Sequence, residues 1–392
     1  MVTGGALSLP GLVLLGIWNW LTCLQLLEAR AAVPVAMATG ASSYSAVANA
    51  ALGQVGVLLL EANLLLTLLG VCTAMQVQAA ELLAACTPFS YGAAVLASAC
   101  LLVSLVLQRT LRGIALISAA GLAVLILGLL AVAAYGIAVY GDDLTPLPES
   151  FSAFPSDVHA LALFFGICCF SFGLQMTLLP VQDSLREPSR ASEAVHYSLI
   201  LIVLLYALVG YGLGALFARA PPRGVEQLIL LNLPQPSPLA TAVQCSSAAV
   251  ALLSYPLPLM PLVQLMRARL ASCGRLRFCC RKLQQKPLAG DSLLPAEAGA
   301  VVRLGTLVLT SLLALVLRQF GIAAGFVGSL SIFASLVLPP LCHLRLCAWP
   351  PGGMAPRRSG AAALDVALVS LGMVAFMVFT YKAFMTGMSR SD

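Results

Sequence analysis

The chain has 392 residues, of which 60% are hydrophobic and only 9% are charged. Soluble domains are about 45–50% apolar and about 25% charged, so this chain has too few charged side chains to cover a water-exposed surface. The composition excludes an ordinary soluble protein and predicts an integral membrane protein. The net charge of +6 does not indicate nucleic acid as a partner, because the basic residues lie between apolar segments, where they set membrane orientation.

The apolar residues fall into long runs that are free of charge or nearly so. A helix needs about 20 predominantly apolar residues to cross a hydrocarbon layer of roughly 30 Å. The sequence has about ten such segments: 6–28, 54–83, 91–107, 113–140, 159–181, 195–218, 237–266, 299–318, 321–342 and 361–386. Helices satisfy their own backbone hydrogen bonds in lipid, and no strand alternation interrupts the segments. We therefore expect an all-α, multi-pass membrane protein with about ten transmembrane helices.

The basic residues predict the orientation of these helices. The loop from Arg267 to Lys286 holds seven of the 21 lysines and arginines, and basic loops stay on the cytosolic side of a membrane. Alternation from this loop places both ends of the chain on the opposite side. The same basic cluster is expected to attract anionic lipid. The sequence does not distinguish a plasma membrane from a vacuolar or lysosomal one.

Four stretches, in order and spacing, resemble the amino acid/auxin permease family, which includes proton-coupled, vesicular and vacuolar amino acid transporters. Residues 163–180, Leu-Phe-Phe-Gly-Ile-Cys-Cys-Phe-Ser-Phe-Gly-Leu-Gln-Met-Thr-Leu-Leu-Pro, resemble the sixth helix of that family. The resemblance continues at residues 230–234 (Leu-Leu-Asn-Leu-Pro), 325–331 and 338–340. It covers most of the chain, from about residue 11 to 386.

The resemblance implies an inverted-repeat (LeuT-like) fold of five helices plus five, followed by one extra helix. Residues 1–140 then form the first repeat, residues 159–342 the second, and residues 361–386 the extra helix, all within one transmembrane domain. The stretch from Thr3 to Pro10 resembles the break in the family's first helix, but only two residues precede it. We therefore expect the first helix to be truncated and the first repeat to be incomplete.

The resemblance also implies where a substrate binds. In such folds the first helix of each repeat is interrupted at mid-membrane, and the freed backbone groups hold the substrate. A weaker candidate is Tyr255, beside two prolines that are expected to kink the segment at residues 237–266. The implied substrate-binding residues are Thr3, Gly4, Gly5, Gly166, Phe170, Ser171, Gly173, Gln175 and Tyr255. The alternative for Gly166 and Gly173 is that they only permit close helix packing.

A few ionisable residues lie inside or beside the apolar segments. Glu61 is a candidate for carrying a coupling proton, since a carboxylate at membrane depth is costly and marks function by default. The alternative is that it lies near the cytosolic end of its helix and reaches the lipid headgroups. His159, His196 and His343 lie at predicted helix ends and form no ligand cluster, so we expect no metal site and no cofactor.

The function that this resemblance implies is secondary active transport of small neutral amino acids by alternating access, with transport linked to protons. An alternative from another class is a non-transporting membrane sensor or assembly protein that keeps the transporter scaffold. An enzyme is not expected, because the sequence has no His-Glu-x-x-His motif and no pair of aspartates at membrane depth.

Overall fold

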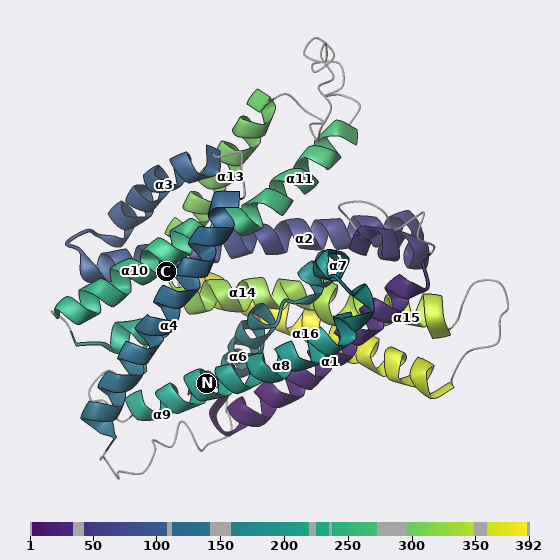
Figure 1. Cartoon of the computed structure of the whole chain (residues 1–392), viewed down its shortest axis with the longest axis horizontal. Helices are drawn as coiled ribbons and strands as arrows, with labels where there is room; N and C mark the ends of the chain where they lie inside the picture. The colour runs from purple at the N-terminus through teal and green to yellow at the C-terminus, as the bar shows by residue number, and fades with distance from the viewer. Residues whose placement is uncertain are drawn as a thin grey trace. The chain divides into compact units, whose positions relative to one another are not determined.

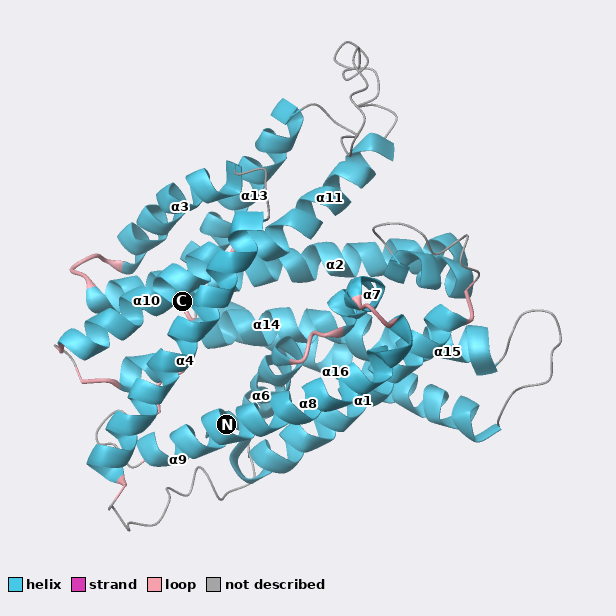
Figure 2. Cartoon of the chain, viewed as in Figure 1, coloured by secondary structure: helices cyan, strands magenta, loops and turns pink. Residues whose placement is uncertain are grey.

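The computed structural model describes residues 2–33, 43–107, 112–141, 158–218, 225–234, 237–272, 296–348 and 359–389. Within these ranges the chain forms helices joined by short connections, with no strand (Figure 2). Nine helices of the described residues are long and apolar enough to cross a membrane, and one further apolar helix, Tyr91–Leu107, is shorter. The all-helical, multi-pass architecture predicted from the sequence is confirmed.

Contacts divide the chain into two compact units. Unit 1 comprises Met1–Thr67, Val139–Val225 and Ala324–Asp392, and unit 2 comprises Leu68–Ala138 and Glu226–Ala323. Each unit draws on both of the repeats expected from the sequence. The long helices α2 (Ser43–Cys86) and α14 (Phe320–Ile332) contribute residues to both units.

Unit 1 is built around α1, which packs against α6, α7, α8 and α15 (Figure 1). Its helices are η1 (Val2–Leu7), α1 (Ser8–Ala31), α6 (Val158–Ser171), α7 (Gln175–Ser184), η3 (Pro188–Arg190), α8 (Ala191–Tyr206), η4 (Ala207–Leu213), α9 (Gly214–Phe217), η6 (Phe333–Val337), α15 (Leu338–His343), η7 (Leu344–Ala348) and α16 (Ser359–Ser389), together with parts of α2 and α14.

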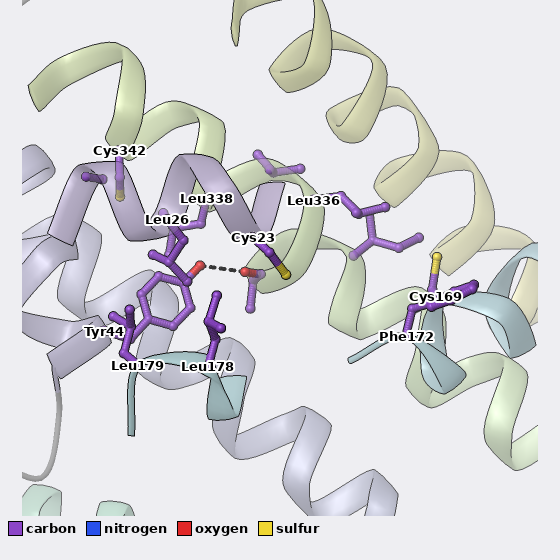
Figure 3. Packing of buried hydrophobic residues seen from close by; sticks show 14 of the residues in the cluster. Cys23, Leu26, Tyr44, Cys169, Phe172, Leu178, Leu179, Leu336, Leu338 and Cys342 are labelled. Atoms are coloured by element: carbon purple, nitrogen blue, oxygen red, sulfur yellow. Dashed lines mark hydrogen bonds between the residues drawn. The ribbon is translucent and has the colours of Figure 1, made fainter. Parts of the chain in front are cut away.

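The core of unit 1 is apolar. Leu26, Leu179 and Leu338 are fully buried in one cluster, and the Tyr44 ring lies among them with its hydroxyl donating to the carbonyl oxygen of Ala334 (Figure 3). Ala334 belongs to η6, a π-helical stretch. The prolines at 339 and 340 follow this stretch and have no N–H to donate, which disturbs the regular helical ladder before them.

In unit 2, α3 (Tyr91–Leu107) packs against α10 (Pro238–Ser254), α11 (Pro256–Ser272) and α13 (Ala296–Val316). The remaining elements are α4 (Arg112–Tyr140), η5 (Ile229–Asn232) and the second part of α2. The predicted segment at residues 237–266 is divided at Tyr255, where α10 ends and α11 begins with Pro256. The division lies beside the prolines from which a kink was expected.

Glycines allow α6 and α14 to approach each other closely in unit 1. A Cβ on Gly328 would lie only 1.7 Å from the carbonyl oxygen of Gly166, and a Cβ on Gly166 would lie 2.3 Å from the carbonyl oxygen of Gly325. These neighbours are backbone atoms, which cannot turn aside. Close packing therefore accounts for Gly166.

We expect Gly328→Ala to lower the stability of the protein, because its methyl group would force α14 away from α6. Overpacking of this kind costs about 1–3 kcal/mol. The matched control is Gly305→Ala on α13, where a Cβ meets nothing within 4 Å; this helical alanine should stabilise by about 0.5–1 kcal/mol. Thermal unfolding of the purified variants measures both, and equal melting temperatures would contradict the close contact.

Candidate functional site

The predicted segment at residues 159–181 is interrupted. Helix α6 ends at Ser171 and α7 begins at Gln175. Between them, the N–H of Phe172 still donates to the carbonyl oxygen of Cys168 at 3.1 Å, but the N–H of Leu174 donates to that of Phe172 at 2.6 Å. The regular ladder of bonds to the fourth preceding residue is therefore broken at residues 172–174, and backbone groups are freed there.

Gly173 lies at the centre of this interruption. A Cβ at this position would meet only the carbonyl oxygen of Phe170, at 3.7 Å, which is an ordinary contact. Close packing therefore explains Gly166 but not Gly173. A glycine here lowers the cost of leaving the helical conformation.

Gln175 begins α7 and is fully buried. Its Nε2 donates to Asn19 Oδ1 and to Thr22 Oγ1, both at 2.9 Å, and both partners belong to α1. The Asn19 amide nitrogen in turn donates to the Leu15 carbonyl oxygen at 2.8 Å. The Gln175 Oε1 is buried without a hydrogen-bond partner in the structure. The start of α7 is thus fixed to α1, with one amide oxygen left available as an acceptor.

The other side of the interruption is held by Tyr206, the last residue of α8. Its hydroxyl donates to the carbonyl oxygen of Ser171 at 2.9 Å, and its ring meets the buried ring of Phe172 edge-on at 5.6 Å between centroids. The Ser171 hydroxyl donates to the Ile167 carbonyl oxygen within α6. Tyr206 therefore satisfies one backbone acceptor that the interruption frees. Phe170 lies half-buried in the last turn of α6.

The break expected in the first repeat falls in η1, at a different level along α6 from the interruption at residues 172–174. Thr3, Gly4 and Gly5 belong to η1, which contains a kink at Gly5 with φ 49° and leads directly into α1. A Cβ on Gly11 would lie 3.1 Å from the Phe164 ring, whereas Asn19 contacts Gln175. Helix α1 therefore runs in the same direction as α6 and α7. Gly5 lies about 20 Å along α1 from the level of Asn19, at 1.5 Å per residue.

The remaining two predicted residues, Tyr255 and Glu61, belong to helices other than α6 and α7. Tyr255 belongs to unit 2, where it is fully buried and its hydroxyl lies 2.8 Å from Thr310 Oγ1. Glu61 lies half-buried on α2, after a kink at Gly53 with φ 65°. Two residues on, the Asn63 amide nitrogen donates to the Leu330 carbonyl oxygen at 2.8 Å. The proposed lipid site at Arg267–Lys286 lies mostly outside the described residues.

Three residues of the site were missed by the sequence reasoning: Asn19, Thr22 and Tyr206. A signal for the first two was present, because polar residues three positions apart inside an apolar segment indicate a shared, inward-facing side of a helix. Tyr206 gave no such signal, since a tyrosine near the middle of an apolar segment is compatible with either an exposed or a buried position.

The fold defines a multi-pass helical membrane protein in which one membrane-spanning helix is interrupted. A family model described as "Transmembrane amino acid transporter protein" matches residues 1–385. The chain therefore belongs to this family of amino acid transporters, and the resemblance read from the sequence is confirmed. The family is one of transporters and not of enzymes.

Individual relatives match shorter parts of the chain. The human vesicular inhibitory amino acid transporter is 29% identical over 196 residues, which are 48% of this chain and 34% of the relative. The vacuolar amino acid transporter 4 of Saccharomyces cerevisiae is 29% identical over 123 residues, which are 31% of this chain and 17% of the relative. The matched region thus spans about a third or less of the length of these relatives.

We expect Tyr206→Phe to destabilise the protein, because the Ser171 carbonyl oxygen, which is partly shielded from solvent, loses its donor. An unsatisfied buried group of this kind costs about 1–3 kcal/mol. The control is Tyr197→Phe on the same helix, whose side chain is exposed and whose replacement should change stability by less than about 0.5 kcal/mol. Thermal unfolding in detergent tests the pair; a Tyr206→Phe protein as stable as its control would show that the hydroxyl does not support the interruption.

Proposed function

We propose that this protein transports small neutral amino acids across a membrane by alternating access, with transport linked to protons. The observation that carries the proposal is the interruption of a membrane-spanning helix at residues 172–174, in a chain that belongs to a family of amino acid transporters. Interrupted helices of this kind hold substrates in secondary transporters.

The interruption offers complementary groups to an amino acid. The N-terminus of α7 carries partial positive charge and suits a carboxylate, whereas the C-terminal carbonyl groups of α6 suit an ammonium group. The free Oε1 of Gln175 adds a further acceptor. Residues 160–182 contain no charged side chain. A charged substrate side chain would lack a partner there, which favours neutral amino acids.

The division of the chain supports the mechanism. Alternating access is largely the movement of one rigid body against another around a fixed site. Here the chain forms two compact units, and the interrupted helix with its supports Asn19, Thr22 and Tyr206 lies wholly within unit 1. The site is thus built by one of the two bodies.

Reconstituted protein should take up at least one labelled neutral amino acid into proteoliposomes, and uptake should rise when a pH gradient is imposed. The panel should contain all protein amino acids and their common neutral derivatives, with protein-free liposomes as the control. No uptake above the control across the panel would contradict the proposal and favour the alternative, a non-transporting sensor or assembly protein that keeps the scaffold.

We expect Gln175→Met to reduce uptake by roughly 10- to 100-fold, which corresponds to losing a hydrogen bond to a charged group. Methionine keeps the length of the side chain but has no amide oxygen. The control is Gln182→Met, at the other end of α7. Equal losses in both variants, or an unchanged rate in Gln175→Met, would argue against a contact between Gln175 and the substrate.

Glu61 remains the candidate carrier of the coupling proton on α2. Glu61→Gln cannot release a proton, so we expect uptake that no longer responds to the imposed pH gradient while exchange of internal for external substrate continues. Counterflow and gradient-driven uptake, measured on the same vesicles, separate these activities. If gradient-driven uptake is unchanged, Glu61 does not carry the proton.

A further inference from the structure

A buried group of ionisable residues ties three helices of unit 1 together. His343 is the last residue of α15, Asp365 lies near the beginning of α16, and Glu28 lies in the last turn of α1. His343 and Asp365 are 7% and 1% exposed, whereas the side chain of Glu28 is largely exposed. Neither the sequence reasoning nor the proposed transport site uses these residues.

Both nitrogens of the imidazole face a carboxylate. His343 Nδ1 lies 2.7 Å from Asp365 Oδ2, and His343 Nε2 lies 3.0 Å from Glu28 Oε2. The second oxygen of Asp365 accepts from Gln25 Nε2 at 2.8 Å. The amide oxygen of Gln25, itself a buried residue, has no hydrogen-bond partner in the structure.

The two contacts of the imidazole require one proton more than a neutral imidazole and two carboxylates carry together. A neutral imidazole carries a single N–H and can donate to only one of the two carboxylates. The second contact would then set a nitrogen lone pair against a carboxylate, and two negative charges would remain, one of them on a buried side chain. One added proton, on the imidazole or on either carboxylate, turns both contacts into hydrogen bonds.

We propose that Glu28, His343 and Asp365 form a proton-binding site, and that the bound proton fastens the ends of α1, α15 and α16 to one another. The ligand is a single proton that the three groups share. When it leaves, the exposed Glu28 separates from the imidazole first, whereas Asp365 keeps its bond from Gln25. The site exists whether or not the protein transports an amino acid.

Other charged groups near the site do not replace this proton. Arg30 follows Glu28 on α1 and lies 3.7 Å from Asp183 of α7. Arg345 on η7 follows His343 but is exposed. Lys382, the one Lys or Arg among the described residues of α16, lies about 25 Å along that helix from Asp365, at 1.5 Å per residue. Among the described residues of the helices packed against α15, Glu28 and Asp365 are the charged groups that contact the imidazole.

The test is the pH dependence of thermal stability in the purified full-length protein. The proton-dependent contacts stabilise the protein at acid pH and are lost as the pH rises through the imidazole range, so the stability that His343 contributes should fall in that direction. Between about pH 5.5 and about pH 8.5, the melting temperature of the wild type should decrease by at least about 3 °C more than that of His343→Gln. Parallel curves would overturn the proposal.

Two further variants give the test its controls. His196→Gln replaces a histidine on α8 whose ring meets that of Trp20 and lies outside the site, so this variant should keep the wild-type slope. Glu28→Gln alters only the exposed member of the site and should fold even if His343→Gln does not. It should move the midpoint of the pH dependence; an unmoved midpoint would overturn the role of Glu28.

Direct titration of the imidazoles keeps the proposal testable on the unmodified protein. The chain has only three histidines, so their side-chain resonances in a histidine-labelled sample can be followed with pH. One resonance should titrate with a midpoint that changes in Glu28→Gln and stays the same in His196→Gln. If all three histidines titrate identically in the wild type and in Glu28→Gln, the shared proton does not exist.

Discussion

Two departures from the regular helix in unit 1, at residues 172–174 and in η6, depend on one constraint: a backbone polar group within lipid needs a partner, because no water is present to supply one. The interruption at residues 172–174 frees the Ser171 carbonyl oxygen, and Tyr206 donates to it. In α14 and η6, the carbonyl oxygens of Leu330 and Ala334 accept from Asn63 and Tyr44. Polar side chains from neighbouring helices thus stabilise the irregular backbone by hydrogen bonding to its carbonyl oxygens.

Helix α1 links the interrupted helix to the proton-binding site. Asn19 and Thr22 hold Gln175 at the start of α7, and one turn further on Gln25 and Glu28 contact Asp365 and His343. These four polar residues are spaced three positions apart along an otherwise apolar helix, so each lies about one turn beyond the last. Helix α1 therefore contacts both the start of α7 and the group of ionisable residues at the ends of α15 and α16.

The sequence predicted the helices well because hydrophobic length is a local property of the chain. The family resemblance also implied the interruption near Gly173, where Ser171 and Gln175 add polar side chains to an apolar segment. The two roles of Gly166 and Gly173 could not be separated in this way. Only the position of α14 shows that Gly166 permits a close approach and that Gly173 does not.

Contacts between residues from distant parts of the chain could not be predicted either, because local patterns do not show which helices pack together. His343 lies 315 positions from Glu28, and nothing in the spacing of either residue indicates that they meet. A histidine at a helix end is compatible with exposure to headgroups, whereas a histidine between two carboxylates is a titratable device. The packing of α15 against α1 and α16 distinguishes the two interpretations. The order of the helices along the sequence does not show this packing. Because each compact unit combines segments that are far apart in the sequence, the contacts between ionisable residues arise between distant segments. A pattern read at single residues does not show such contacts.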